Sequence, residues 1–191
     1  MGNGRLLRRL PNILTLMNMS LGLSAVLVLL QTDHPYKAFI APILIVLGGV
    51  ADFFDGFLAR KLNAVSGMGK QLDSFADLIT FGVAPILLIN YISACESFVV
   101  IIVASLIYIM AGAYRLARFN LADFSKHFLG LPIPAAGIAL VVYSVTYPLW
   151  ITPDYANIRT IITTAFIILL SAMMVSKKKI KRIAAHDEKV K

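Results

Sequence analysis

Six apolar segments of about 20 residues follow one another along the chain, separated only by short connections. A helix of about 20 residues is needed to cross the hydrocarbon core of a bilayer, so runs of this kind predict membrane-spanning helices. Only 15% of the residues are charged, against roughly 25% in soluble domains. We therefore expect an all-α integral membrane protein with six transmembrane helices. The expected spans are residues 11–31, 37–59, 72–93, 97–117, 132–150 and 158–176.

The connections leave no room for a separate soluble domain, so residues 1–191 are expected to form a single membrane domain. The basic stretch GRLLRRL predicts a short amphipathic segment over residues 1–10 that lies on the membrane surface. The apolar run after it is longer than that of a typical signal peptide and lacks a clear cleavage site, which favours a first membrane helix. The six-helix core then occupies residues 11–176, and residues 177–191 form a basic cytoplasmic tail.

Positive charges are distributed unevenly between the two ends of the expected helices. Of the 18 Lys and Arg residues, 16 fall on one side, and only Lys37 and Arg159 fall on the other. Because positive residues stay cytoplasmic, both termini are expected to face the cytoplasm across the cell membrane. The net charge of +8 then predicts attraction to anionic lipid headgroups, and it argues against a nucleic-acid-binding protein.

Residues 51–82, ADFFDGFLARKLNAVSGMGKQLDSFADLITFG, carry four aspartates in apolar or nearly apolar segments. A charged side chain at the bilayer centre costs roughly 2.5–3.5 kcal/mol, and these four are expected nearer the cytoplasmic ends of their helices. Asp52 and Asp55 are three residues apart, so they face one side of a helix. Asp73 and Asp77, four residues apart, do the same on the next helix. The connection over residues 61–70 contains two glycines and is expected to turn the chain back, so that the two pairs face each other.

Converging carboxylates favour a divalent cation such as Mg²⁺, Mn²⁺ or Ca²⁺, because these hard ions prefer oxygen ligands. Four carboxylates can hold two ions, and two-metal sites serve displacement at phosphorus. The single cysteine, Cys95, and three scattered histidines argue against a Cys/His metal cluster. The alternative is that the acids pair with nearby cations in a structural ion network or a cation pathway. The cations concerned are Arg60, Lys61, Arg115 and Arg118.

Small residues and one arginine are interleaved with the acids, namely Gly56, Ala59, Arg60 and Gly69. Glycine and alanine let a bulky ligand approach a helix backbone closely, and arginine offers a fork of donors to a phosphate. The alternative role of the small residues is helix–helix packing, which we favour for Gly48 and Gly49.

The same stretch fits the pattern D-x2-D-G-x2-A-R-x8-G-x3-D-x3-D at every fixed position and resembles the signature of the CDP-alcohol phosphotransferases. The resemblance implies an integral membrane enzyme with six core helices, usually a homodimer. Such an enzyme transfers a phosphoalcohol from a CDP-linked donor to an acceptor hydroxyl and releases CMP. The implied cofactor is a divalent metal, Mg²⁺ or Mn²⁺, as one or two ions. Asp52, Asp55 and Asp73 would be metal ligands, and Asp77 would be the general base and a further metal contact.

The resemblance also implies where the CDP moiety of the donor is held. Residues of the motif would cradle the cytidine and its diphosphate, and polar groups of the first helix would lie near the nucleotide. The residues implied are Asp55, Gly56, Ala59, Arg60 and Gly69, with Thr15 and Asn18 from the first helix.

Two later segments, YRLARFN at 114–120 and FLGLPIPAAG at 128–137, resemble the bacterial-type phosphatidylserine synthases within this family. This branch implies CDP-diacylglycerol as donor, L-serine as acceptor, and phosphatidylserine and CMP as products. Serine carries a carboxylate, and Arg115 and Arg118 lie three residues apart at a helix end. We expect these two to bind serine or a phosphate. Their alternative role is to set the membrane topology.

Several alternatives stay open at this point. The acceptor of a related enzyme would be glycerol-3-phosphate or an inositol phosphate, and an archaeal ether lipid would replace diacylglycerol in the donor. A cation transporter would use the membrane acids for ion flux without any chemistry. A lipid-binding or scaffold protein would tolerate loss of the acids.

Overall fold

The computed structural model describes residues 10–31, 36–93, 98–121, 128–146, 156–176 and 179–180. The expected surface segment and most of the basic tail therefore lie outside the described residues, as does Cys95. Helices account for nearly all of what is described, which confirms the all-α class. They are α2 (Leu10–Leu30), α3 (Lys37–Lys61), α4 (Gly67–Asp77), the π-helix η1 (Leu78–Val83), α5 (Ala84–Ser93), α6 (Phe98–Leu121), α7 (Ile133–Thr146) and α8 (Ala156–Val175). Two-residue strands β1 (Phe128–Leu129) and β2 (Lys179–Ile180) pair antiparallel.

Five helices among the described residues are long and apolar enough to cross a membrane. They correspond to five of the six expected spans, with α4, η1 and α5 forming one of them. The sixth expected span, residues 132–150, contains the apolar helix α7, which is 14 residues long. That length is about 21 Å, shorter than a hydrocarbon core of roughly 30 Å, and residues 147–150 are outside the description.

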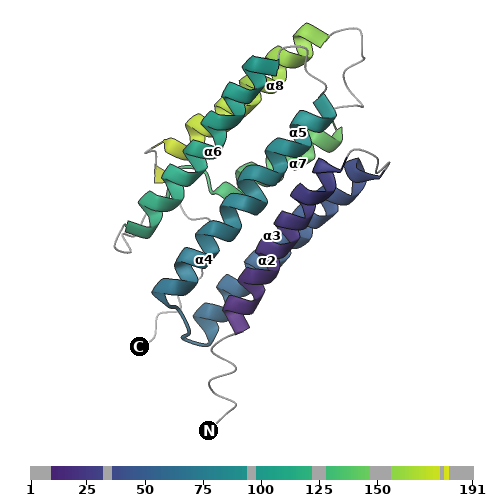
Figure 1. The fold of residues 1–191 in the computed structure, drawn as a ribbon. Coiled ribbons are helices and arrows are strands. Elements are labelled where there is room, and N and C mark those ends of the chain that lie inside the picture. Colours follow the sequence, from purple (N-terminus) through teal and green to yellow (C-terminus); the bar gives the residue numbers. More distant parts are fainter. Residues whose placement is uncertain are drawn as a thin grey trace.

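The span formed by α4, η1 and α5 is the central helix of the bundle. Its most apolar window is 56% buried, more than that of any other span in the described part of the chain. The helix pair α2 and α3 packs along it, α7 packs against α5 and η1, and α6 pairs with α8 (Figure 1). The core between the helices includes Ile45, Phe81, Tyr108 and Leu140, all fully buried.

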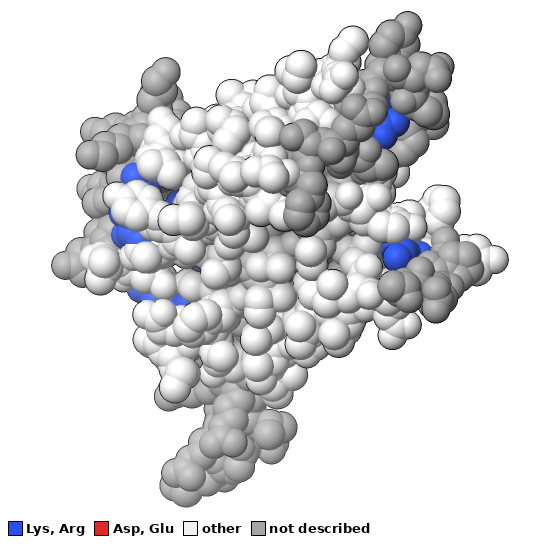
Figure 2. Space-filling view, turned by 45° about the horizontal axis from the view of Figure 1, so that its top comes forward, with Lys and Arg blue, Asp and Glu red and all other residues white. Residues whose placement is uncertain are grey.

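The outward faces of the helices carry large apolar side chains. Phe39, Val99 and Met110 are each about 70% exposed, which is expected where the surroundings are lipid. Figure 2 shows one face of the molecule, on which Lys and Arg atoms lie toward the edges and no Asp or Glu is visible. These features support a multi-pass membrane protein.

The connection between α3 and α4 differs from the expectation. The third span was expected to begin at residue 72, with both glycines in the turn, but α4 begins at Gly67. The Ser66 hydroxyl caps it by accepting a hydrogen bond from the Gly69 N–H at 3.0 Å. Asn63, with a φ of 47°, supplies the left-handed residue of the turn, a conformation that Asn tolerates better than most residues. The turn is therefore residues 62–66, and both glycines belong to the helix.

Glycines allow neighbouring helices to approach the central helix at η1. A Cβ added to Gly48 would lie 2.7 Å from the Thr80 methyl carbon, and one added to Gly137 would lie 2.7 Å from the Phe81 carbonyl oxygen. Gly22 faces the Thr80 backbone and side chain in the same way. Close packing through small residues, expected for Gly48, is therefore what the structure shows.

Replacing Gly137 with Ala should destabilise the protein, because the new methyl group would meet backbone atoms of Phe81 that have no room to move. Overpacking of this kind costs roughly 1–3 kcal/mol, and thermal unfolding in detergent should detect it as a lowered midpoint. Gly67→Ala is the matched control, since a Cβ there meets nothing within 4 Å. Equal midpoints for the two variants would contradict the packing argument.

Candidate active site

Three carboxylates converge where α3 and α4 face each other. Asp52 and Asp55 lie near the C-terminal end of α3, and Asp73 lies on α4. Each can offer one oxygen atom such that the three atoms lie within 4.8 Å of one another. The turn over residues 62–66 reverses the chain, and α2 packs against both helices, so the arrangement follows from the chain reversal and the helical spacing of the acids.

Asp77 joins this group from one turn further along α4. Its side chain is only 7% exposed, and its carboxyl group interacts with those of Asp52 and Asp73. The Asp77 Oδ1 atom has no hydrogen-bond partner within the described structure. The Arg115 guanidinium of α6 is also close enough to interact with Asp77 electrostatically. The two acidic pairs therefore face each other as expected.

The donor set fits a divalent cation. Like charges held this close repel one another, and Arg115 is the positive group that acts on Asp77. All the converging ligand atoms are carboxylate oxygens, which suit Mg²⁺ or Mn²⁺. The partnerless Asp77 oxygen is a further ligand atom available at the same place.

The two polar candidates of the first helix occupy different environments. The Thr15 hydroxyl lies 2.7 Å from Asp55 Oδ2 and 3.0 Å from the Pro11 carbonyl oxygen, so it is placed to donate to the carboxylate. Asn18, one turn deeper, is fully buried, and neither atom of its side-chain amide has a partner in the described part of the chain. Its Oδ1 faces Gly48, and its backbone oxygen accepts a hydrogen bond from Thr80. The structure therefore brings Thr15 to the acids and places Asn18 between α2, α3 and η1.

Gly56 has more space beside it than Gly69 does. A Cβ on Gly56 would meet only the flexible Arg60 guanidinium, at 3.4 Å. One on Gly69 would meet Asn12 Oδ1 and Ser66 Oγ, each at 3.1 Å, which is closer than ordinary van der Waals contact. The space beside Gly56 is therefore accessible to a ligand, whereas Asn12 and Ser66 already contact Gly69.

Two polar residues near the site were not expected. Asn12 of α2 faces Gly69. The Asn120 amide of α6 donates to Ser74 Oγ at 2.8 Å, next to Asp73 in the chain. Asn120 ends the YRLARFN segment, so a signal for it was present in the sequence. Asn12 precedes the motif by 40 residues, and no local pattern connects it with Gly69.

The two arginines at the end of α6 have different contacts. Arg115 is 7% exposed and directed toward Asp77, and its Nε atom has no hydrogen-bond partner in the described structure. The Arg118 guanidinium donates to the Val175 carbonyl oxygen at 3.3 Å, at the C-terminal end of α8. The charge of Arg118 also acts on Arg115, so the two lie near each other, as their spacing predicted.

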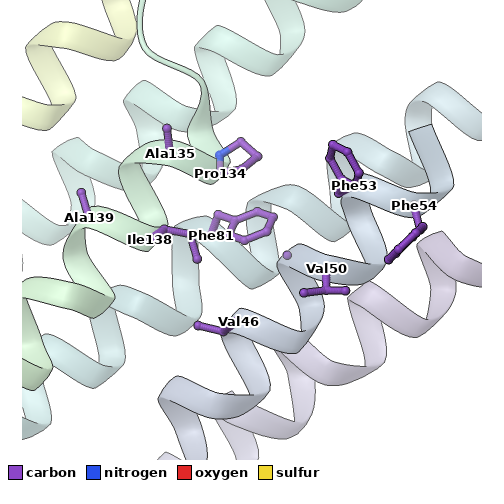
Figure 3. A pocket seen from close by; sticks show the side chains of 10 residues that line it. Val46, Val50, Phe53, Phe54, Phe81, Pro134, Ala135, Ile138 and Ala139 are labelled. Atoms are coloured by element: carbon purple, nitrogen blue, oxygen red, sulfur yellow. The ribbon is translucent and has the colours of Figure 1, made fainter. Parts of the chain in front are cut away.

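An apolar groove runs along α3. It has a volume of about 790 Å³ and lies between α3, η1 and α7. Phe53 and Phe54 line the end of the groove nearer the C-terminus of α3, and Phe81 lies between α3 and α7 (Figure 3). The remaining lining residues are Val46, Gly49, Val50, Pro134, Ala135, Ile138 and Ala139.

Comparison with known proteins agrees with this geometry. A family model described as CDP-alcohol phosphatidyltransferase matches residues 8–177. A protein of Bacillus subtilis named CDP-diacylglycerol–serine O-phosphatidyltransferase is 40% identical over 178 residues, 93% of this chain and 92% of its own. The archaetidylserine synthase of Methanothermobacter thermautotrophicus is 35% identical over 178 residues, 91% of this chain and 70% of its own.

A third relative, from Helicobacter pylori, carries the same printed name as the Bacillus protein and is 33% identical over 135 residues. That alignment covers 69% of this chain and 55% of the relative. The family match contains the whole aspartate motif and every helix that positions it. It confirms the resemblance seen in the motif, and this chain belongs to the CDP-alcohol phosphatidyltransferase family.

Proposed function

We propose that this protein is a CDP-diacylglycerol–serine O-phosphatidyltransferase, which transfers the phosphatidyl group of CDP-diacylglycerol to the hydroxyl of L-serine and releases CMP. The observation that carries the proposal is the convergence of three carboxylate oxygens within a bundle of membrane-spanning helices. A diphosphate needs cations that the carboxylates can hold, and acyl chains need apolar surroundings such as the groove along α3. A lipid-linked nucleotide requires both in one protein.

Serine as acceptor is supported by two relatives whose names differ in the lipid. The Bacillus protein is named for diacylglycerol and serine, and the Methanothermobacter protein for archaetidylserine. What the names share is serine. Diacylglycerol is the better-supported lipid, because the Bacillus relative is 40% identical and matched over 92% of its length. An archaeal ether-lipid donor remains the alternative.

Asp52, Asp55 and Asp73 are the proposed ligands of Mg²⁺ or Mn²⁺, with Asp77 as a further ligand if two ions bind. A divalent ion held by these residues would supply positive charge to neutralise the diphosphate and stabilise CMP as the leaving group. Thr15 supports metal binding by Asp55, because its hydrogen bond to Asp55 Oδ2 holds that carboxylate in a fixed orientation.

Asp77 is the proposed general base. It takes the proton from the serine hydroxyl while that oxygen forms a bond to the phosphorus that carries diacylglycerol, and the bond from this phosphorus to the CMP oxygen breaks. Its burial and its partnerless Oδ1 support the assignment, since a base needs a free lone pair where water is scarce.

The two substrates reach this site from different phases. The proposed contacts of cytidine and its diphosphate are Gly56, Ala59 and Gly69, with Asp55 beside them and Arg60 as a hydrogen-bond donor to phosphate. The space beside Gly56 supports this assignment. The groove along α3 would take apolar chains of the lipid. Asn18 is too deeply buried to contact the nucleotide without a rearrangement.

Arg115 is the better-supported of the two arginines for the serine carboxylate. Its position beside Asp77 would place the serine hydroxyl near the base, whereas Arg118 already contacts the end of α8. The positive-inside rule supports an active site that faces the cytoplasm, in the cell membrane. A homodimer is proposed from the family resemblance.

Purified protein should release CMP from CDP-diacylglycerol only when both L-serine and Mg²⁺ or Mn²⁺ are present. Glycerol-3-phosphate and inositol phosphate are the comparison acceptors, and EDTA should abolish the release. Faster release with either comparison acceptor would reassign the substrate. Ion flux in proteoliposomes without CMP release would favour the transporter instead.

Asp77→Asn should lower kcat by roughly 10²–10⁴-fold, because general base catalysis contributes about that much. Binding of CDP-diacylglycerol, measured by equilibrium titration, should be largely retained. Asp55→Asn is the comparison variant and should lose Mn²⁺ binding as well. Turnover by Asp77→Asn at the wild-type rate would remove Asp77 from the role of base.

Arg115→Lys should raise the KM for serine by about tenfold while leaving the KM for CDP-diacylglycerol unchanged. Lysine keeps the charge but loses the planar fork that binds a carboxylate at two points, a difference on the order of 1–2 kcal/mol. Arg118→Lys is the matched control at the same helix end. A larger serine effect in the control would transfer the acceptor role to Arg118.

A further inference from the structure

The central helix changes from α to π directly after Asp77. The π-helical segment covers Leu78–Val83, and the Ala84 N–H donates to the Ile79 carbonyl five residues back. Each residue of an α-helix turns the chain by roughly 100°, so one residue added to a turn rotates the two flanking segments relative to each other by about that angle. Asp73 and Asp77 lie on one side of this change, and the buried α5 lies on the other. π-Helical turns are rare and occur frequently at functional sites.

Pro85 explains why the backbone needs outside support here. Proline has no N–H, so the Phe81 carbonyl lacks the donor that an α-helix would supply four residues later. The Tyr108 hydroxyl of α6 donates to this carbonyl oxygen at 3.0 Å, and the tyrosine side chain is fully buried. A side chain of another helix therefore supplies a hydrogen bond that Pro85 cannot.

A second hydrogen bond holds η1 from the opposite direction. The Thr80 hydroxyl donates to the Asn18 backbone oxygen of α2 at 3.2 Å, and Thr80 is fully buried. Gly22 and Gly48 make room for Thr80, and Gly137 makes room for Phe81. The π-helical turn is thus fixed against α2, α3, α6 and α7 at once.

The helices that hold η1 also contact the acids. On α2, Thr15 lies one turn before Asn18 and hydrogen-bonds to Asp55. On α6, Arg115 lies two turns after Tyr108, and both side chains are buried. The geometry points to Tyr108 as a positioning residue: its hydroxyl holds the π-helical turn, and the turn sets the rotation that directs Asp73 and Asp77 toward Asp52. The kinetic part of this inference rests on the proposed function, but the metal-binding part does not.

Mn²⁺ affinity tests the inference without any substrate. Tyr108→Phe should weaken Mn²⁺ binding by roughly tenfold, which is the smaller of the losses in metal affinity seen when a group that supports metal ligands is removed. Electron paramagnetic resonance on the purified full-length protein measures this affinity. Tyr143→Phe is the matched control. It also removes a phenolic oxygen, which lies 3.0 Å from Thr163 Oγ1 and takes no part in the acidic site. Its Mn²⁺ affinity should equal that of the wild type. Wild-type affinity in Tyr108→Phe would overturn the inference.

Kinetics separate positioning from simple stability. In Tyr108→Phe, kcat should fall by about 10²-fold, the effect of a small misplacement of reacting groups, while both KM values stay unchanged. Tyr143→Phe should keep its kcat even if its thermal midpoint falls equally. If the wild type does not turn over serine but Tyr108→Phe still binds Mn²⁺ more weakly, the proposed function fails and the positioning role stands.

A second pair of variants covers the case in which Tyr108→Phe does not fold. Thr80→Val has the same shape as threonine but lacks the hydroxyl, whereas Thr80→Ser keeps it. Weak Mn²⁺ binding in Thr80→Val that is restored in Thr80→Ser would support control of the acids by η1. Wild-type Mn²⁺ affinity in Thr80→Val would overturn it.

Discussion

Mutual repulsion among four aspartates within membrane-embedded helices is the constraint on which the rest of the structure depends. Ionisable groups in such helices are costly and face the bundle interior or a water-filled cavity. Here they do so at the junction of α3 and α4, where three of them can present oxygen atoms within 4.8 Å of one another. The surrounding scaffold holds these carboxyl groups together, and a bound divalent cation would remove their mutual repulsion.

Close helix packing forms that scaffold. Lipid is as apolar as the helix surfaces, so helices in a membrane associate through van der Waals contact and hydrogen bonds more than through a hydrophobic force. Gly22, Gly48 and Gly137 let three helices approach η1, and the hydroxyls of Tyr108 and Thr80 bond to backbone oxygens at the same level. Thr80 and Phe81, which make these contacts, follow Asp77 by three and four residues.

The position of the acids along the helices suits a reaction between water-soluble substrates and a membrane lipid. Arg60 and Lys61 end α3, close to where the acidic site begins, so the site lies at the basic end of that helix. The groove lies along the middle part of the same helix, at residues 46–54. A polar substrate can therefore approach from the basic end of α3, while a lipid approaches from its apolar middle.

The sequence by itself determined the class of the fold, five of the six expected spans and the convergence of the four acids, because these follow from hydrophobic run length and helical periodicity, which are local properties. Periodicity also placed the motif residues on shared faces, and recognition of the motif indicated the family. The predicted start of α4 was wrong because glycines usually indicate a turn. Here the Ser66 cap begins the helix before both glycines.

Tertiary structure alone decided the rest. Thr15 reaches Asp55, Asn18 is fully buried, and Arg115 and Arg118 find different partners, Asp77 and the end of α8. The π-helical turn depends on Tyr108, 27 residues beyond the carbonyl that it supports. Contacts of this kind join residues that no periodic pattern relates, so only the packed arrangement of the helices defines them.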